Sequence, residues 1–238
     1  MSDARCARIS GEAPVVREDP GASLVLPGRF AAVVFDMDGL LLDSEPLWVA
    51  AEADLLVAHG QAHTPADAAA THGRSIEDSV RVYAERIGGV TYEALEAEFL
   101  ELMGARYRAG APLRPGASAL VRALHGRIPC AVASSTAGRL VRMALEGAGL
   151  LDCFDAIASG HDLGRAKPAP DAYLEACRLL GVAPADAVAF EDSPTGIRSA
   201  RDAGLFVVGV PEREGVDLAA AGADMVLGSL EQVVVAPA

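Results

Sequence analysis

Short apolar runs alternate with helical patterns along most of the sequence, and polar or glycine residues close each run. The apolar runs cover residues 31–35, 128–133, 154–158, 187–190, 206–210 and 225–227. Helical patterns that end before a glycine cover residues 136–146, 171–180 and 194–203. Short apolar runs between turn residues are typical of strands buried on both faces, and helices between them indicate a parallel sheet. We therefore predict an α/β fold with a Rossmann-like, doubly wound and mostly parallel sheet.

The interval 44–113 breaks this alternation, because four helical patterns follow one another there without a strand between them. Gly60 closes the first pattern, and the segment 64–67 (TPAD) supplies a cap, a proline and an acid at the start of the second. We expect an inserted, all-helical cap domain. The predicted division is a flexible N-terminal tail at 1–29, a core domain at 30–43 and 114–238, and the cap domain at 44–113.

Composition argues against several classes of protein. With 238 residues, of which 51% are hydrophobic, the chain can bury one full core and a smaller subdomain. Its longest apolar runs fall far short of the ~20 residues needed to cross a bilayer, so we expect no membrane association. The net charge of -13 argues against nucleic acid, whose binding relies on clustered Lys and Arg. No obligate protein partner is evident.

The cysteines and the N-terminal residues bear on location. Cys6, Cys130, Cys153 and Cys177 are scattered and form no CxxC pair of the kind used in zinc or redox sites. The first 29 residues mix charged residues with prolines and lack the continuous apolar centre of a secretory signal. A reducing, cytoplasmic location fits these features best.

Asp36 and Asp38 directly follow the first apolar run, at the carboxyl end of a predicted strand, where open α/β sheets bind their ligands. One account of the pair is that Asp36 attacks phosphorus while a cation screens its repulsion with the phosphate, and that Asp38 donates and accepts protons. Gly39 lets the chain turn sharply, so that both acids face one site. An Asp-x-Asp after a strand also forms turns and helix caps, and taken alone the motif leaves both interpretations open.

Hydroxyl groups and a lysine follow two later strands. Ser134 and Ser135 end the second run, where a hydroxyl and free amides can hold phosphate oxygens, although Ser-Ser-Thr is equally typical of ordinary helix capping. Lys167 lies in a loop between Ala166 and Pro168, and the proline restricts the backbone there. Its ammonium could neutralise both Asp36 and a phosphoryl group, whereas a lone loop lysine is usually solvated.

A second acidic pair, Glu191 and Asp192, closes the strand predicted at 187–190. A hard cation such as Mg²⁺, which prefers carboxylate and water oxygens, would suit this cluster together with Asp36. Helix capping by Asp192 or Ser193 is the alternative. Four strand ends of one sheet thus carry, in order, a carboxylate pair, a hydroxyl, a lysine and a second carboxylate pair.

In this arrangement the chain resembles the haloacid dehalogenase superfamily over residues 31–230. The segments that carry the resemblance are 33–39 (VVFDMDG), 132–135 (VASS), 167–168 (KP) and 190–193 (FEDS). The segment 42–48 (LDSEPLW) is similar to members of the β-phosphoglucomutase-like and sugar-phosphate phosphatase branch. The helical interval after the first motif corresponds to the position of that superfamily's first type of helical cap.

The resemblance implies a role for each matching residue. Asp36 is the implied nucleophile and Asp38 the acid and base, while Ser134, the amide of Ser135 and Lys167 contact the phosphate. Asp36, the backbone carbonyl of Asp38, and Asp192 are the implied Mg²⁺ ligands, with Glu191 bound directly or through water. In the cap, the segment 71–75 (THGRS) resembles a substrate-specificity loop. Arg74 of that segment is therefore a candidate for contact with the substrate, although a solvated arginine at a helix start is equally compatible with the sequence. Glu45, in the segment 42–48, is the second candidate for contact with the substrate.

We predict a Mg²⁺-dependent phosphatase that hydrolyses a small phosphate monoester, a sugar or polyol phosphate, through an aspartyl-phosphate on Asp36. Its partner would be a small phosphorylated metabolite. The first alternative is a sugar phosphomutase, which returns the phosphoryl group to another sugar hydroxyl. A more distant one is a signalling receiver module that phosphorylates an Asp, although in such modules the acidic pair precedes that Asp, and they lack an insertion like 44–113.

Overall fold

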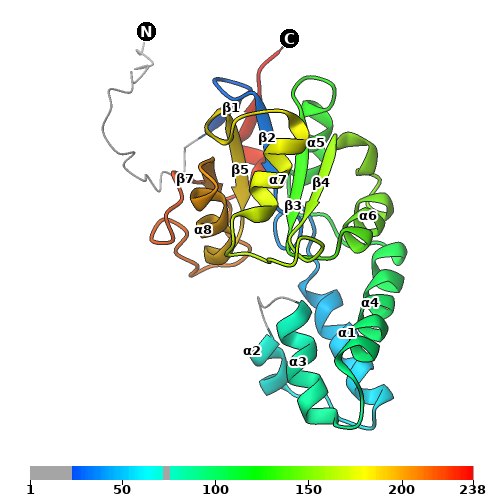
Figure 1. Ribbon diagram of the computed structural model, residues 1–238. Helices are drawn as coiled ribbons and strands as arrows, with labels where there is room; N and C mark the ends of the chain where they lie inside the picture. The colour runs from blue at the N-terminus through cyan, green and yellow to red at the C-terminus, as the bar shows by residue number, and fades with distance from the viewer. Residues whose placement is uncertain (1–22, 72–75, 238) are drawn as a thin grey trace.

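The computed structural model describes residues 23–71 and 76–237, and within them six strands form one parallel sheet (Figure 1). The strand order is β4, β3, β2, β5, β6, β7. The strands are β2 Ala32–Phe35, β3 Cys130–Ser134, β4 Ala156–Ser159, β5 Ala187–Glu191, β6 Phe206–Gly209 and β7 Met225–Val226. After β2, the chain adds β3 and β4 on one side of this strand and then β5, β6 and β7 on the other side. The order therefore reverses between β2 and β5, and such a reversal opens a ligand-binding crevice at the carboxyl ends of the strands.

Helices cover both faces of the sheet. They are α5 Ala117–Leu124, α6 Gly138–Gly147, α7 Asp171–Leu180 and α8 Pro194–Asp202, with short 3₁₀ turns at η1 Leu151–Cys153, η2 Pro184–Asp186 and η3 Leu230–Gln232. Side chains alternate along each strand, so Val33 and Phe35 pack with α5 and α6, whereas Ala32 and Val34 pack with α7 and α8. This double burial explains the continuous apolar runs. The predicted fold class is confirmed, and each predicted run overlaps a strand.

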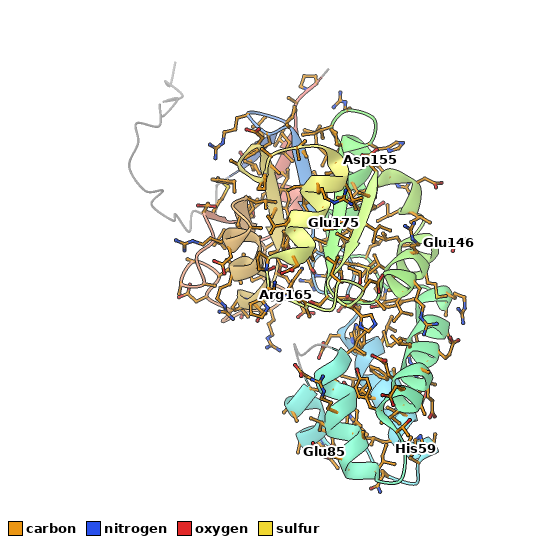
Figure 2. The ribbon with its side chains drawn as sticks, viewed as in Figure 1. His59, Glu85, Glu146, Asp155, Arg165 and Glu175 are labelled. Atoms are coloured by element: carbon orange, nitrogen blue, oxygen red, sulfur yellow. The ribbon has the colours of Figure 1, made fainter. Side chains whose placement is uncertain are left out.

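Between β2 and α5 the described residues form four helices, which we call the helical insertion. They are α1 Glu45–Ala58, α2 Pro65–Thr71, α3 Ile76–Ile87 and α4 Tyr92–Ala109. Figure 1 shows them together at one side of the core, with α4 running alongside α6. In Figure 2, Arg165 lies at the edge of the core that faces the helical insertion. His59 and Glu85 lie at the end of the insertion that is farthest from the core.

The two segments that join the insertion to the core lie side by side. Leu42 and Leu113 form an antiparallel bridge, and the amide of Asp43 donates to the carbonyl of Pro112 at 2.8 Å. The chain thus leaves and re-enters the core at one place, close to the predicted boundaries at 44 and 113. The division into a core domain and a cap domain remains a proposal.

The N-terminal prediction needs one correction. Residues 24–26 lie inside the predicted flexible tail, yet they form strand β1 (Leu24–Leu26), which pairs in parallel with β8 (Val233–Val235). Leu26 is fully buried. A three-residue run carries too little pattern to identify a strand whose partner lies at the other end of the chain. Residues 1–22 lie outside the described part of the chain. Among the described helices, none is both long and apolar enough to cross a membrane.

Candidate active site

The register of β2 brings the candidate residues to one edge of the sheet. Phe35 pairs with Phe190, and their rings stack with centroids 5.2 Å apart, so the residues that follow, Asp36 and Glu191, are neighbours. The amide of Asp36 donates to the carbonyl of Phe190 at 3.0 Å. On the other side of β2, β3 runs past its pairing with Phe35 and ends at Ser134. The core packing of the phenylalanines thus fixes where the acids stand.

Lys167, from the loop after β4, lies between two of these carboxylates. Its Nζ is 2.5 Å from Asp36 Oδ1 and 2.6 Å from Glu191 Oε1, and its side chain is only 6% exposed. Tyr173 of α7 donates to the same Glu191 oxygen at 2.8 Å. Lys167 is also the only lysine in the sequence, in which all other cationic residues are arginines. A compact ammonium fits between two carboxylates, whereas a planar guanidinium needs a wider, flat contact.

The electrostatics of this edge are dominated by burial. Burial raises the pKa of Asp36 to about 8, although the ammonium of Lys167 opposes the shift. The pKa of Asp192 lies well above its usual range, because of burial and then of the negative charge of Asp36. Burial would lower the pKa of Lys167, but Asp36 and Glu191 outweigh it and the pKa is raised. The site therefore keeps a firmly charged ammonium among acids whose ionised forms are disfavoured by burial and by one another.

Asp38 links the core to the helical insertion. Its Oδ1 accepts hydrogen bonds from Ser44 Oγ at 2.6 Å, Tyr107 Oη at 2.6 Å and Trp48 Nε1 at 3.3 Å. Its Oδ2 accepts from Thr136 Oγ1 at 2.8 Å. Donors from α1, α4 and the loop after β3 thus fix the orientation of one carboxylate, a degree of positioning that proton transfer requires.

A cavity of about 370 Å³ lies between the sheet edge and the helical insertion. The core side is lined by Asp36, Asp38, Ser134, Ser135, Lys167 and Asp192, and the insertion contributes Glu45, Val49, Glu52, Thr71, Ile76 and Ser79. Glu45, a predicted substrate contact, therefore faces the cavity. Arg74, the other one, lies outside the described residues.

A family model described as haloacid dehalogenase-like hydrolase matches residues 30–204, well over half of the chain. The chain belongs to this family. The predicted resemblance is confirmed, and the enzyme class, a hydrolase of phosphoric monoesters, is confirmed with it. A signalling receiver module is no longer a candidate.

Proteins with phosphatase names and one solved structure match most of the chain. Hexitol phosphatase A from Escherichia coli (strain K12) is 35% identical and covers 87% of this chain and 94% of its own length. Validoxylamine A 7'-phosphate phosphatase from Streptomyces hygroscopicus subsp. limoneus is 31% identical, with 86% and 96% covered. The crystal structure of CbbY from Rhodobacter sphaeroides in complex with phosphate superposes with a TM-score of 0.76 at 28% identity, over 84% of this chain and 95% of that one.

The acids of this HAD-like hydrolase fit a divalent cation. Asp36, Glu191 and Asp192 each offer a carboxylate oxygen, and these three oxygens lie within 4.8 Å of one another. One ammonium cannot balance three carboxylates, and hard oxygen donors suit a small divalent ion. Gly39, with φ of 86°, allows the close approach, because a Cβ there would overlap the Asp192 carboxylate.

Glu191 differs from the other two acids in its surroundings. Its Oε1 accepts from Lys167 and Tyr173, and its Oε2 accepts from the amide of Asp192 at 3.1 Å and from the amide and hydroxyl of Ser193 at 3.3 and 3.2 Å. Glu191 is fully buried behind the cavity wall. The capping alternative holds for Ser193, whose hydroxyl accepts from the amide of Gly196 at the start of α8.

The serine pair lies where the sequence places it, but it does not cap α6. Ser134 Oγ accepts from the amide of Thr136 at 3.0 Å, and Ser135 Oγ accepts from the amide of Lys167 at 3.2 Å. The first amide of α6, that of Gly138, instead points to the carboxylate of Asp162. The serines therefore organise the loops that surround Asp36.

Several contacts of this site are missing from the sequence-based prediction. Tyr107 and Thr136 bind Asp38, and Tyr173 binds Glu191. Thr136 follows the predicted serine pair, so its position offered a signal. Tyr107 and Tyr173 are helical aromatics whose spacing is that of core residues, and nothing in the sequence marks their hydroxyls.

Proposed function

We propose that the protein is a Mg²⁺-dependent phosphatase that hydrolyses a small sugar or polyol phosphate through an aspartyl-phosphate on Asp36. The observation that carries this proposal is the position of Asp36. Asp36 directly follows a central strand, and its carboxylate faces the cavity and has Oδ1 bound to Lys167. A nucleophile needs a fixed orientation and a nearby positive charge when it approaches an anionic phosphate.

In the first step Oδ2 of Asp36 attacks phosphorus, since Oδ1 is held by Lys167. A P–O bond to Asp36 forms, and the P–O bond to the ester oxygen breaks. Asp38 delivers the proton that the departing alkoxide needs. The ammonium of Lys167 lies beside the reacting carboxylate and offsets the charge that collects on the phosphoryl oxygens.

In the second step water attacks the phosphorus of the acyl phosphate, and Asp38 takes the proton from that water. The P–O bond to Asp36 breaks, orthophosphate leaves and the carboxylate is restored. Asp38 returns to its protonated state for the next turnover. Its donors on both sides of the cavity keep the same group in place for both transfers.

Asp36, the backbone carbonyl of Asp38, and Asp192 are the groups that we propose hold Mg²⁺. When bound, the cation would screen the repulsion between carboxylate and phosphate and polarise the phosphoryl oxygens. Because both oxygens of Glu191 already have donors, we propose that Glu191 supports this cluster through Lys167 and through water. Ser134 and the amide of Ser135 would hold the remaining phosphate oxygens, beside Lys167.

The relatives and the walls of the cavity support the proposed substrate class. Two matched proteins are named as phosphatases of a hexitol and of validoxylamine A 7'-phosphate. The wall that the helical insertion contributes is rich in polar side chains, including Glu45, Thr71 and Ser79. Such groups can bind the hydroxyls of a small phosphorylated metabolite. We place the reaction in the cytoplasm.

A phosphate-release screen over sugar, polyol and nucleoside monophosphates, with and without Mg²⁺, tests the proposal. We expect orthophosphate from polyol or sugar phosphates only when Mg²⁺ is present. Phosphorus NMR on the same mixtures separates the phosphatase from a mutase. Accumulation of an isomerised ester without orthophosphate would overturn the proposal in favour of a mutase, and Mg²⁺-independent release would overturn the metal requirement.

A further inference from the structure

We propose that Glu52 is a specificity-determining residue that accepts a hydroxyl hydrogen from the non-reacting end of the substrate and disfavours a second anionic group there. The inference rests on the proposed phosphatase function and specifies the chemistry of the substrate end that lies away from the phosphate. Glu52 belongs to α1 and lines the same cavity as Asp36.

The position of Glu52 along helix α1 sets its distance from the reacting centre. Ser44, which precedes the helix, and Trp48, in its first turn, both donate to Asp38 Oδ1. Glu52 comes four residues after Trp48, so it lies on the same helical face and about 6 Å farther along the axis. Glu45, Trp48 and Glu52 all line the cavity. Glu52 therefore stands one helical turn beyond the group proposed to protonate the leaving oxygen, within reach of a short polyol chain.

The carboxyl of Glu52 is built into a polar network and is not a solvated surface group. The residue is only 5% exposed. Thr71 Oγ1 donates to its Oε2 at 2.9 Å, and His63 Nε2 lies 3.6 Å from the same oxygen. Tyr83, fully buried, approaches the hydroxyl of Thr71 at 3.5 Å. Burial raises the pKa of Glu52, and a buried acid in a cavity wall lowers stability unless it is well satisfied, which makes it a candidate for function.

The charges of the described residues around the cavity favour this selectivity. The acids that line it are Asp36, Asp38, Glu45, Glu52, Asp192 and Glu212. Among the described lining residues only Lys167 and Arg213 are cationic, and Lys167 is bound to Asp36 and Glu191. A second phosphate or carboxylate on the substrate would approach Glu52, whereas a hydroxyl can donate to it. An unpaired anion next to a buried carboxylate is strongly unfavourable, so this wall favours a neutral, hydroxylated substrate end.

The test compares esters that differ at the end away from the phosphate. For the wild type and for Glu52→Leu and Glu52→Gln, kcat/KM is measured with sorbitol 6-phosphate, with para-nitrophenyl phosphate, which has no hydroxyl groups, and with 2-phosphoglycolate. We expect Glu52→Leu to lower the ratio of kcat/KM for the sorbitol ester to kcat/KM for the aryl ester at least about tenfold. Glu52→Gln should lower this ratio less, because the amide oxygen can still accept a hydrogen bond. Both variants should raise the ratio of 2-phosphoglycolate to the sorbitol ester.

Asp54→Asn is the matched control, because it removes a carboxylate from the same helix at an exposed position that does not line the cavity. It should leave the ratio within about twofold even if the loss of its contact with Arg106 lowers the Tm. The proposal is overturned if the ratio is unchanged in Glu52→Leu, or if Asp54→Asn shifts it equally, which would assign the effect to the placement of the helix. A wild type inactive on all three esters would instead overturn the phosphatase function itself.

Discussion

Tyr107 donates a hydrogen bond of 2.6 Å from its hydroxyl to Oδ1 of Asp38, although 69 positions separate the two residues in the sequence. Tyr107 lies near the end of α4, and Asp38 lies just after β2. Tyr107 is fully buried and Asp38 is half-buried, and burial raises the pKa of the Tyr107 phenol well above its usual range. The phenol therefore remains a donor at any physiological pH and joins the helical insertion to the group that moves protons in the proposed reaction.

Tyr107→Phe removes one donor from Asp38 and keeps the ring. We expect kcat with a polyol phosphate to fall about three- to tenfold, because the carboxyl loses part of its orientation, and KM to change little. Steady-state kinetics checks this. Tyr92→Phe, at the other end of α4, is the matched control, and its hydroxyl contacts Glu96 and not the site. Equal kinetics for both variants would contradict the role given to Tyr107.

Lys167→Met leaves Asp36 and Glu191 facing each other without a counter-charge. Breaking a buried ion pair in this way costs about 3–5 kcal/mol of unfolding free energy, and kcat should fall by about 10²–10³. Urea denaturation and phosphate release measure the two effects. Lys167→Arg should regain stability better than activity, because the guanidinium keeps the charge but not the shape. The control is Arg165→Ala, an exposed change expected to stay within about 0.5 kcal/mol. A stable, active Lys167→Met would refute the ion-pair account.

Gly196→Ala tests the packing behind the site. A Cβ at Gly196 would overlap the carboxylate of Glu191, which holds Lys167 in turn. We expect a loss of more than about 2 kcal/mol of stability together with reduced activity. Gly104→Ala in α4 is the control, since its Cβ would meet only side chains, with Met143 Sδ at 3.2 Å, and alanine favours the helix. Similar stabilities of the two variants would show that Glu191 can move freely.

The start of α2 gives a pH-dependent prediction. Hydrogen bonds from Thr64, followed by the contact with Arg86, lower the pKa of Asp67 to about 2. A folded-state pKa below the unfolded value means that Asp67 contributes stability above about pH 4, and that this contribution is lost as the pH falls toward 2. A carboxyl-carbon NMR titration should place the midpoint near 2, and Thr64→Ala should raise it. A wild-type midpoint near 4 would contradict the capping geometry.

Much of the core could be predicted from the sequence, because its strands are short apolar runs and its acids follow them directly. That Asp36 and Glu191 each stand at a strand end is a local signal, whereas the pairing of Phe35 with Phe190, which sets the two acids side by side, joins distant segments. The capping signal at Thr64 and Asp67 was equally local and is present in α2. Features that depend on a few neighbouring residues were therefore accessible.

The rest depends on packing between distant segments. Tyr107, Tyr173 and Glu52 resemble core or surface residues in a helical pattern, and only the docking of their helices turns them toward the cavity or the acids. Strand β1 was missed for the same reason, because its partner β8 lies at the opposite end of the chain. The substrate contact predicted at Arg74 lies outside the described residues, so it stays a prediction.

The central claim is that Asp36 carries the phosphoryl group, and trapping that intermediate tests it most directly. Enzyme turning over a polyol phosphate with Mg²⁺ is quenched in acid and reduced with borohydride, which converts an acyl phosphate to an alcohol, and the peptides are analysed by mass spectrometry. We predict that Asp36 is converted to homoserine, and that Asp36→Asn shows no such product and loses nearly all activity. Conversion at another carboxylate, or Asp36→Asn activity within about tenfold of the wild type, a change of only ~1.4 kcal/mol in the barrier, would contradict the account.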